Sequence, residues 1–196
     1  MSHNVITYNQ AVGRWEPDAA GRLRGAAMEL FETVGYEDAT VAQIADRAGV
    51  TARTFFRYFA DKPEVLFAGS DNLQIEMVAA LRSTPEDASA LEALRVALEA
   101  AAKLLTERAD FARRRSAIIA ANPALAEREL MKMAHLSEGL AEALAERGVS
   151  EPRASMTAQA GVAAFRVAFA TWVQRPKASL RRLIEENLAI VASLGE

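Results

Sequence analysis

A short stretch around Gly49 predicts two helices joined by a tight turn, and it constrains the fold more than any other part of the chain. Thr40 is a good N-cap for a first helix over residues 41–48, where apolar side chains recur on one stripe. Gly49 fits the end of that helix, because glycine takes the left-handed conformation without a steric cost. Thr51 is placed to cap a second helix, from residue 52 to about residue 59. The stretch is therefore predicted to form a helix-turn-helix, in which the first helix braces the second.

The second of these helices has an apolar side and an outer side. Phe55 and Phe59, four residues apart, lie on the same side, and we expect them to pack inward. The remaining side chains suit an approach to DNA, because cations and hydroxyls hold phosphates and an arginine can pair with a guanine edge. On this reasoning the candidate contacts are Arg53, Thr54, Arg57, Tyr58 and Lys62. The alternative is an ordinary helical hairpin whose arginines lie on a solvated face.

Residues 24–66 contain a series of short motifs: Ala-x-x-Leu-Phe, Gly-Tyr, Thr-Val-x-x-Ile-Ala, Ala-Gly-Val, and Phe-x-x-Lys shortly before Leu66. They resemble the N-terminal domain of TetR/AcrR-type transcriptional regulators. The resemblance implies DNA contacts from Thr40, Thr51, Arg53, Thr54, Phe56, Tyr58 and Lys62. One position departs from the family, since Phe56 stands where members usually carry a tyrosine whose hydroxyl meets a phosphate. The resemblance then implies either more anchoring by Arg57, Tyr58 and Lys62 or a lower affinity.

The whole chain is predicted to be an all-α protein of about nine helices. Alanine, leucine, glutamate and arginine are abundant, whereas strand formers are sparse. The N-terminus lacks the basic and apolar regions of a signal peptide. The most apolar window, residues 156–173, contains Arg166 and is too polar to cross a bilayer. We therefore expect a cytoplasmic protein without a membrane segment.

Catalysis and metal binding are not indicated. The chain has no cysteine, which excludes disulfides and thiolate ligands. His135 is one of two histidines, and no second ligand lies at a suitable spacing. There is no Ser-His-Asp set and no phosphate-binding loop. We therefore expect no enzyme activity, no cofactor and no metal site.

The net charge of −3 at first argues against a polyanionic partner, but binding to such a partner depends on the charge of the contacting surface and not on that of the whole chain. Residues 51–62 carry three cations against Asp61 alone. Two copies of the chain would double these cations on one face, and binding to DNA depends on the phosphates neutralised there.

The chain is predicted to have three parts. A helix that starts at residues 61–63 and continues to about Leu81 is predicted to touch both domains. The resemblance to TetR/AcrR-type regulators implies that this helix moves the DNA-binding part when a ligand binds. Arg14, in the N-terminal arm, either enters a minor groove or is incidental. The expected boundaries are a flexible arm at 1–16, a DNA-binding domain at 17–64 with its helix-turn-helix at 40–59, and a ligand-binding and dimerisation domain at 65–196.

Two helices near the C-terminus, at about residues 152–173 and 179–194, are predicted to form a dimer interface. Apolar residues surround nearly the whole circumference of the first helix, and such a helix must be covered on nearly every side. Each helix can bury one face in its own domain and another against a second copy. The alternative is a deep core within one domain, but recognition of two DNA half-sites favours the dimer.

An apolar cavity among the helices of residues 88–170 is expected to bind a small, mostly hydrophobic effector. The candidate lining residues are Phe111, Ile118, Met133, Leu136, Phe165, Phe169 and Trp172. Asp110 is expected to cap a helix that carries the arginine triplet 113–115, which spans about 200° of the helix, so at least one arginine points inward or to an interface. Arg115 is taken as the candidate for an anionic group of the ligand. The alternative is a solvated face with salt bridges to Glu107 and Asp110.

Two segments of the C-terminal half carry a second resemblance. Asn-Pro-Ala-Leu-Ala-Glu-Arg-Glu-Leu begins at Asn122, and Ala-Leu-Ala-Glu-Arg-Gly-Val begins at Ala143. Both are similar to ligand domains of the mycofactocin-regulator type. The resemblance implies an acyl-CoA or a similar fatty effector.

The sequence thus predicts a homodimeric, ligand-responsive DNA-binding regulator, acting as a repressor on a palindromic operator. The alternative is a helical protein-interaction module without DNA affinity, which Phe56 and the acidic net charge would favour.

Overall fold

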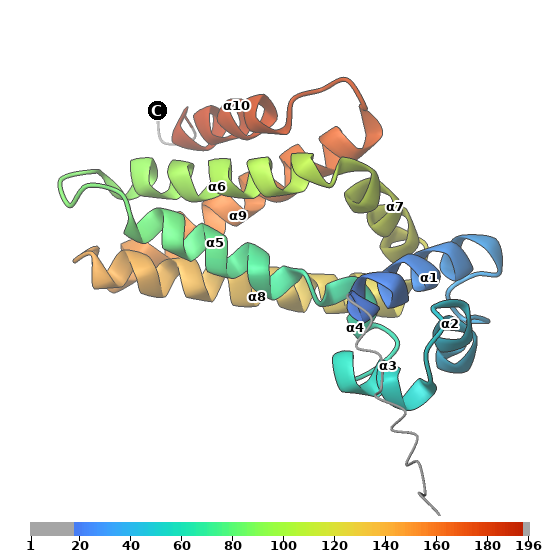
Figure 1. The fold of residues 1–196 in the computed structure, drawn as a ribbon. Coiled ribbons are helices and arrows are strands. Elements are labelled where there is room, and N and C mark those ends of the chain that lie inside the picture. The colour runs from blue at the N-terminus through green and yellow to red at the C-terminus, as the bar shows by residue number, and fades with distance from the viewer. Residues whose placement is uncertain (1–17, 194–196) are drawn as a thin grey trace, which may run out of the picture.

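The structure, a computed structural model, describes residues 18–193, and all regular structure in that range is helical. The all-α prediction is thereby confirmed. A small N-terminal group of helices adjoins a larger bundle (Figure 1). The expected arm at 1–16, with Arg14, lies outside the described residues. The helices are α1 (Ala19–Thr33), α2 (Val41–Arg47), α3 (Ala52–Tyr58), α4 (Glu64–Phe67), α5 (Ser70–Arg82), α6 (Ala90–Glu107), α7 (Ala109–Ala120), α8 (Pro123–Glu146), α9 (Glu151–Gln174) and α10 (Leu180–Ser193).

The N-terminal group is a three-helix domain with a small apolar core. Leu23 of α1, Ile44 of α2 and Phe55 of α3 are fully buried and meet in this core. The predicted caps form: the Thr40 and Thr51 hydroxyls each accept a backbone N–H three residues ahead. Gly49 has φ +70°, the left-handed conformation expected at the turn. Local sequence therefore fixes the relative placement of α2 and α3.

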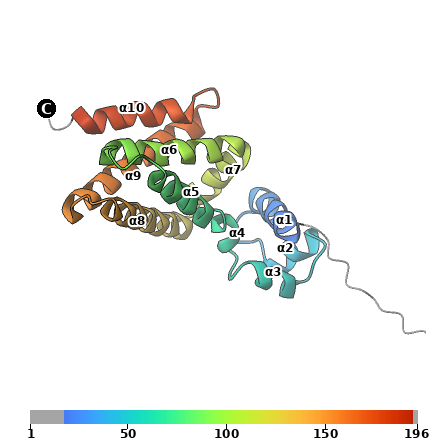
Figure 2. The same cartoon turned by 60° about the vertical axis from the view of Figure 1, so that its left-hand side comes forward.

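The helix expected to start at residues 61–63 is interrupted. Asp61 caps it as predicted, because its Oδ1 accepts the backbone N–H of Glu64 at 2.7 Å. The helix ends after four residues at Phe67, and α5 begins at Ser70, with Gly69 between them. Glycine disfavours a continuous helix at this point. Consequently α4 is a separate short element between the two domains (Figure 2).

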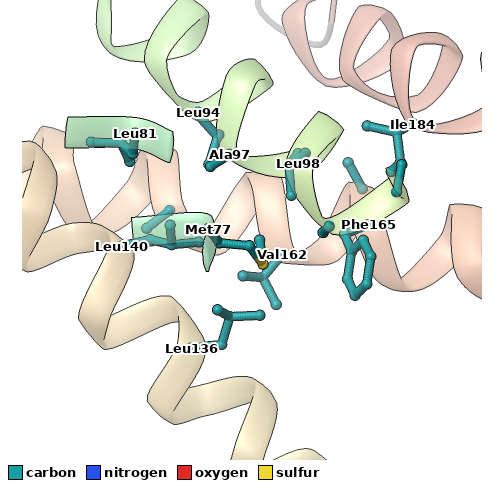
Figure 3. Close-up of a cluster of buried hydrophobic side chains, with 14 of the residues drawn as sticks. Met77, Leu81, Leu94, Ala97, Leu98, Leu136, Leu140, Val162, Phe165 and Ile184 are labelled. Atoms are coloured by element: carbon teal, nitrogen blue, oxygen red, sulfur yellow. The ribbon is translucent and has the colours of Figure 1, made fainter. Parts of the chain in front are cut away.

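The larger bundle is built from α5, α6, α8, α9 and α10 around one apolar core. Met77, Leu98 and Leu140 are fully buried there, and they come from three different helices (Figure 3). Asn187 ties α10 to α9, since its Nδ2 donates to the Ala164 carbonyl at 3.1 Å. One side of α9 therefore belongs to the core of its own domain.

Asp110 is not the N-cap of α7, contrary to the prediction. The helix begins at Ala109, and Arg108 occupies the cap position. The side chain of Asp110 is fully exposed in the first turn. The reason is the short connection, since Arg108 is also the C-cap of α6 and leaves no free residues in which a capping carboxylate could turn back.

Gly161 allows α6 and α9 to approach closely. A Cβ atom at this position would lie 2.4 Å from Cδ2 of Leu94, which is itself almost fully buried. Such a contact requires Leu94 to move, and a packed core resists that movement. The close approach thus depends on the absence of a side chain at residue 161.

Gly161→Ala is expected to lower the free energy of unfolding by about 1–3 kcal/mol, because it overpacks the α6–α9 contact. Gly25→Ala is the matched control, since Gly25 is exposed within α1 and has no neighbour within 4 Å. The free energy of unfolding of the Gly25→Ala control should rise by about 0.5–1 kcal/mol, the usual effect of replacing a helical glycine by alanine. Urea unfolding followed by circular dichroism at fixed protein concentration measures both. Equal stabilisation by the two substitutions would contradict the steric argument.

Candidate DNA interface and ligand cavity

The outer side of α3 carries a compact set of exposed polar and aromatic side chains. Phe55 is fully buried, whereas Arg53, Arg57 and Tyr58 are exposed on the same short helix. Thr54 is half-buried near the N-terminus of α3, and its hydroxyl lies 3.1 Å from that of Thr51. The first turn of this helix also presents free backbone N–H groups and partial positive charge. The predicted DNA-contacting residues of α3 therefore lie together on one outward surface.

Arg53 and Arg57 differ in how their guanidinium groups are held. Within residues 18–193, Arg53 has no hydrogen bond or ion pair. Arg57 lies over the ring of Tyr58, with its Cζ 5.0 Å from the ring centroid, and donates a long hydrogen bond of 3.4 Å to the Tyr58 hydroxyl. Arg53 is thus available for a new partner, and Arg57 and Tyr58 form a preassembled pair of polar groups.

Phe56 is exposed although it is a large apolar residue. Its ring is 57% exposed and packs edge-on against Phe55 at 5.4 Å between centroids. It has no hydroxyl, so its contribution to a phosphate contact is limited to apolar contact with a sugar or a base.

Lys62 is held in a different way from the predicted phosphate contact. Its Nζ donates to the backbone carbonyls of Tyr36, Glu37 and Ala39 at 2.7, 3.2 and 3.0 Å. The same nitrogen lies 4.3 Å from the centroid of the Tyr36 ring. An ammonium has three donors, and all three are occupied here. In this structure Lys62 therefore stabilises the turn between α1 and α2.

Thr40 is exposed at the N-terminus of α2, and it is engaged in a capping box. Its hydroxyl and its backbone N–H both donate to Oε1 of Gln43, at 2.9 and 2.8 Å. The cap fixes the orientation of α2 relative to the preceding turn.

A cavity of about 630 Å³ lies in the C-terminal domain and is bounded by α4, α5, α6, α7, α8 and α9. Its wall is mostly apolar and includes Leu66, Leu73 and Ala112. Its size is within the range of pockets that hold small organic ligands. The predicted ligand-contacting residues that line it are Phe111, Arg115, Met133, Phe165 and Phe169.

Ile118, Leu136 and Trp172 do not line this cavity, contrary to the prediction. Ile118 faces the opposite side of α7, where it packs into the core of the N-terminal domain. Leu136 and Trp172 are buried in the core of the bundle. All three are apolar and lie close to lining residues in sequence, so apolarity alone could not separate the cavity wall from the core.

The arginine triplet 113–115 points in three directions. Arg113 lies over the Trp172 ring at 4.5 Å, Arg114 pairs with Glu32 of α1, and Arg115 faces the cavity. Of the predicted salt bridges to Glu107 and Asp110, only a loose contact of 3.9 Å between Arg113 and Asp110 is seen in the described part of the chain. The three arginines therefore hold α7 to its neighbours rather than form a solvated face.

Two further arginines contribute to the cavity wall, and the sequence alone did not single them out. Arg108 and Arg166 are exposed, so they lie where the cavity meets solvent. No hydrogen bond or ion pair engages either guanidinium within the described residues. Glu129 of α8 also lines the cavity, and it is paired with Arg115. The cavity wall thus has an excess of positive charge together with a large apolar area.

Arginines of α7 and α8 connect the bundle to the N-terminal domain. Arg128 binds Asp61 at 2.9 Å and also Glu64, at the start of α4. Burial disfavours its charge, but the hydrogen bonds and charges of the two carboxylates outweigh this effect and raise the pKa of Arg128. The hydrogen bond from Arg114 likewise holds the pKa of Glu32 below its ordinary value. These residues are far apart in sequence, so no local motif could predict the pairs.

The outward faces of α9 and α10 are apolar in part. Met156 of α9 and Ile190 of α10 are 68% and 58% exposed, and Val167 of α9, which also borders the cavity, is 59% exposed. The opposite side of each helix is buried in the bundle, as Phe165 and Leu188 show. The two helices are therefore apolar on two sides, and one of these sides is uncovered in a single chain.

Family comparisons agree with this two-domain architecture. Residues 23–68 match the family model described as bacterial regulatory proteins, tetR family. Residues 88–194 match the model of the MftR C-terminal domain, which extends over more than half of the chain.

Two curated relatives are similar over part of the chain. The HTH-type transcriptional regulator TcmR of Streptomyces glaucescens is 42% identical over 74 residues, which are 38% of this chain and 33% of TcmR. MftR of Mycobacterium tuberculosis, described as a mycofactocin biosynthesis transcriptional regulator, is 29% identical over 93 residues, 47% of each protein. The chain thus spans less than half the length of either relative.

Solved structures share the fold over nearly the whole chain. FadR of Bacillus subtilis, solved with stearoyl-CoA, has a TM-score of 0.61 at 21% identity and covers 88% of this chain and 97% of its own. FadR of Thermus thermophilus, a transcriptional repressor solved with lauroyl-CoA, has a TM-score of 0.57 at 24% identity, with coverages of 88% and 93%. At these identities the likeness extends to the fold alone.

Proposed function

Since the chain belongs to the tetR family of bacterial regulatory proteins, we propose that it is a ligand-responsive DNA-binding repressor that acts as a homodimer on a palindromic operator. The observation that carries the proposal is the outer surface of α3, where Arg53 pairs with no residue of the described range 18–193 and lies on the same short segment as Thr51, Thr54, Phe56, Arg57 and Tyr58. A braced helix of this kind enters a major groove with its N-terminal residues first. No helix of the described part has the length and apolarity to cross a membrane.

Within this interface the residues have different roles. Arg53 is the candidate for a base or phosphate contact, and Arg57 and Tyr58 are candidates for the phosphate backbone. Lys62 holds the turn before α2, so we assign it a supporting role instead of a direct phosphate contact. Thr40 fixes the orientation of α2 through its capping box and remains exposed to solvent.

A dimer formed through α9 and α10 would place two copies of α3 on one DNA face. The exposed apolar residues of these helices support such a contact, because a second copy would remove them from water. A dimer can bind the two half-sites of a palindromic operator at once, and the distance between its two α3 helices then determines the half-site spacing that it recognises. A single chain presents only one recognition helix.

The effector is proposed to be an amphiphile with an apolar chain and an anionic end, of the acyl-CoA type. The apolar cavity wall supports this choice, as do Arg108 and Arg166, which have no hydrogen bond or ion pair to any residue that the structure describes. The solved FadR proteins with stearoyl-CoA and lauroyl-CoA share the fold, and MftR-type C-terminal domains match this half of the chain. Binding would favour a conformation in which the two α3 helices no longer match the half-site spacing.

Arg53→Ala is expected to weaken operator binding by about 1–3 kcal/mol, because it removes a partner of a base edge or a phosphate. Arg95→Ala, an equivalent change at an exposed ion pair of α6, is the control and should bind as the wild type does. Fluorescence anisotropy with an operator selected from random-sequence DNA, repeated over a range of salt concentrations, measures the effect. Affinity of the wild type should fall steeply with salt.

Unchanged binding by Arg53→Ala would remove the assignment of α3 as the reading helix. If the wild type selects no DNA at all and instead retains a protein partner at high salt, the chain is a protein-interaction module. Phe56 and the acidic net charge are the observations that favour this second function.

A further inference from the structure

Arg115 makes three contacts that join the cavity wall to the linker between the domains. Its Nη1 and Nη2 donate to the two carboxylate oxygens of Glu129 at 3.0 and 2.6 Å. Its Nε donates to the backbone carbonyl of Leu66 at 2.7 Å, and its Cζ lies 4.9 Å from the centroid of the Phe67 ring. Leu66 and Phe67 belong to α4. One side chain therefore connects the cavity directly to the short helix that leads to the DNA-binding domain.

The Arg115–Glu129 pair is a polar but electrically neutral part of the cavity wall. The two side chains are only 14% and 26% exposed, and the bidentate geometry satisfies both charges. An anionic group placed here would have to separate Glu129 from Arg115, its one cationic partner within the described residues, which leaves a partly buried charge unpaired. The anionic end of an effector is therefore expected to bind elsewhere in the cavity.

Arg108 offers that other position on the same side of the cavity. It is the N-cap residue of α7, seven residues before Arg115, and both arginines line the cavity together with Phe111 and Ala112 of that helix. Seven residues correspond to about 10 Å along a helix axis. This stripe of the cavity wall thus runs from Arg108, which has no ion-pair partner among the described residues, across apolar side chains to a neutralised ion pair.

We propose that the Arg115–Glu129 pair is a length gate for the apolar chain of the effector. This rests on the acyl-type effector proposed above. A molecule anchored at Arg108 with a chain shorter than the stripe leaves the pair intact. A longer chain must push against the pair, which it cannot satisfy by hydrogen bonds, and displaces Arg115 from the Leu66 carbonyl. Arg115 is then the specificity-determining and positioning residue, because losing its bond to Leu66 frees α4 to move.

The test compares chain length with DNA release. Straight-chain acyl-CoA thioesters from hexanoyl-CoA to stearoyl-CoA are titrated into the full-length protein, and their binding is measured by calorimetry. The affinity of the thioester-saturated protein for a DNA operator selected from a random pool is then measured. In the wild type, saturation with long thioesters should weaken DNA binding by about tenfold or more, and saturation with short ones by less than about twofold.

The variant is the double substitution Arg115→Gln and Glu129→Gln, which removes both charges together and leaves no unpaired charge. It should bind DNA about tenfold more weakly than the wild type without any thioester, and short and long chains should then act alike. The matched control is Arg114→Gln with Glu32→Gln, which removes another pair between α7 and the DNA-binding domain but does not line the cavity. In the control, long thioesters should still weaken DNA binding much more than short ones do, whatever its affinity for DNA without a thioester.

Two results overturn the length gate while leaving the proposed function intact: equal DNA release by short and long thioesters in the wild type, or an unchanged threshold in the Arg115/Glu129 double variant. Failure of the proposed function is a different result. The wild type would then select no DNA, or bind none of the thioesters, and either finding also removes the length gate. Circular dichroism of each variant checks that the helical fold is retained.

Discussion

Replacing Ile190 by glutamate is expected to produce a monomer whose operator affinity is lower by a factor of about 100 or more, because two linked half-site contacts become one. Ile190 is 58% exposed on the outward face of α10 and does not line the ligand cavity. In the proposed dimer this face is buried, and a carboxylate buried there without a partner costs several kcal/mol. The fold of the single chain should remain, since the substituted side chain is outside the core.

Ile75→Glu is the matched control for this experiment. Ile75 is 62% exposed on α5, which is not one of the two helices of the proposed interface, so the same change should leave the dimer and the DNA affinity as they are. Size-exclusion chromatography with light scattering gives the mass, and anisotropy gives the DNA affinity. A dimeric Ile190→Glu protein, or a monomeric one with wild-type DNA affinity, would contradict the proposed interface.

Phe55→Ala is expected to unfold the N-terminal domain at moderate temperature while the bundle remains folded. Phe55 is fully buried at the centre of the small core, in contact with Phe59 at 5.4 Å between ring centroids. Truncating a buried phenylalanine costs about 3–5 kcal/mol, a large part of what a domain of this size can have. DNA binding should be lost, because α3 is no longer held against α2.

The neighbouring residue provides the control for this substitution. Phe56→Ala removes the same number of atoms from an exposed position and should change thermal stability by less than about 0.5 kcal/mol. Thermal unfolding followed by circular dichroism should show an early partial transition for Phe55→Ala alone. A single transition at the wild-type temperature for Phe55→Ala would show that the small core does not depend on this ring.

The N-terminal domain could be predicted closely because its signals are local. Thr40, Gly49 and Thr51 determine caps and a turn within a few residues, and the structure has each of them in the expected conformation. The spacing of Phe55 and Phe59 likewise reports the buried side of α3 without knowledge of any distant partner. The sequence was sufficient to predict the structure where a residue interacts mainly with its own helix or the adjoining turn.

Prediction was weaker wherever a residue acts on a distant segment. Lys62 was expected at the DNA because it is a cation next to the motif, but its partners are carbonyls some 25 residues earlier. At least one arginine of the triplet 113–115 was expected to face inward, but the sequence did not show which one, because the pairing of Arg115 with Glu129 depends on how α7 and α8 lie side by side. The core residues Leu136 and Trp172 look like cavity residues in sequence, and only packing separates them.

The carboxylates that receive arginines from the bundle belong to the other domain: Glu32 in α1, and Asp61 and Glu64 around the start of α4. The recognition head is therefore not an interchangeable module. In a chimera that joins the DNA-binding domain of another protein to this bundle, Arg114 and Arg128 would face different residues at positions 32, 61 and 64. Their ion pairs would form only if those residues are acidic. Engineered sensors built from this scaffold should transplant the acidic triplet together with the head, so that the response to the effector is passed on.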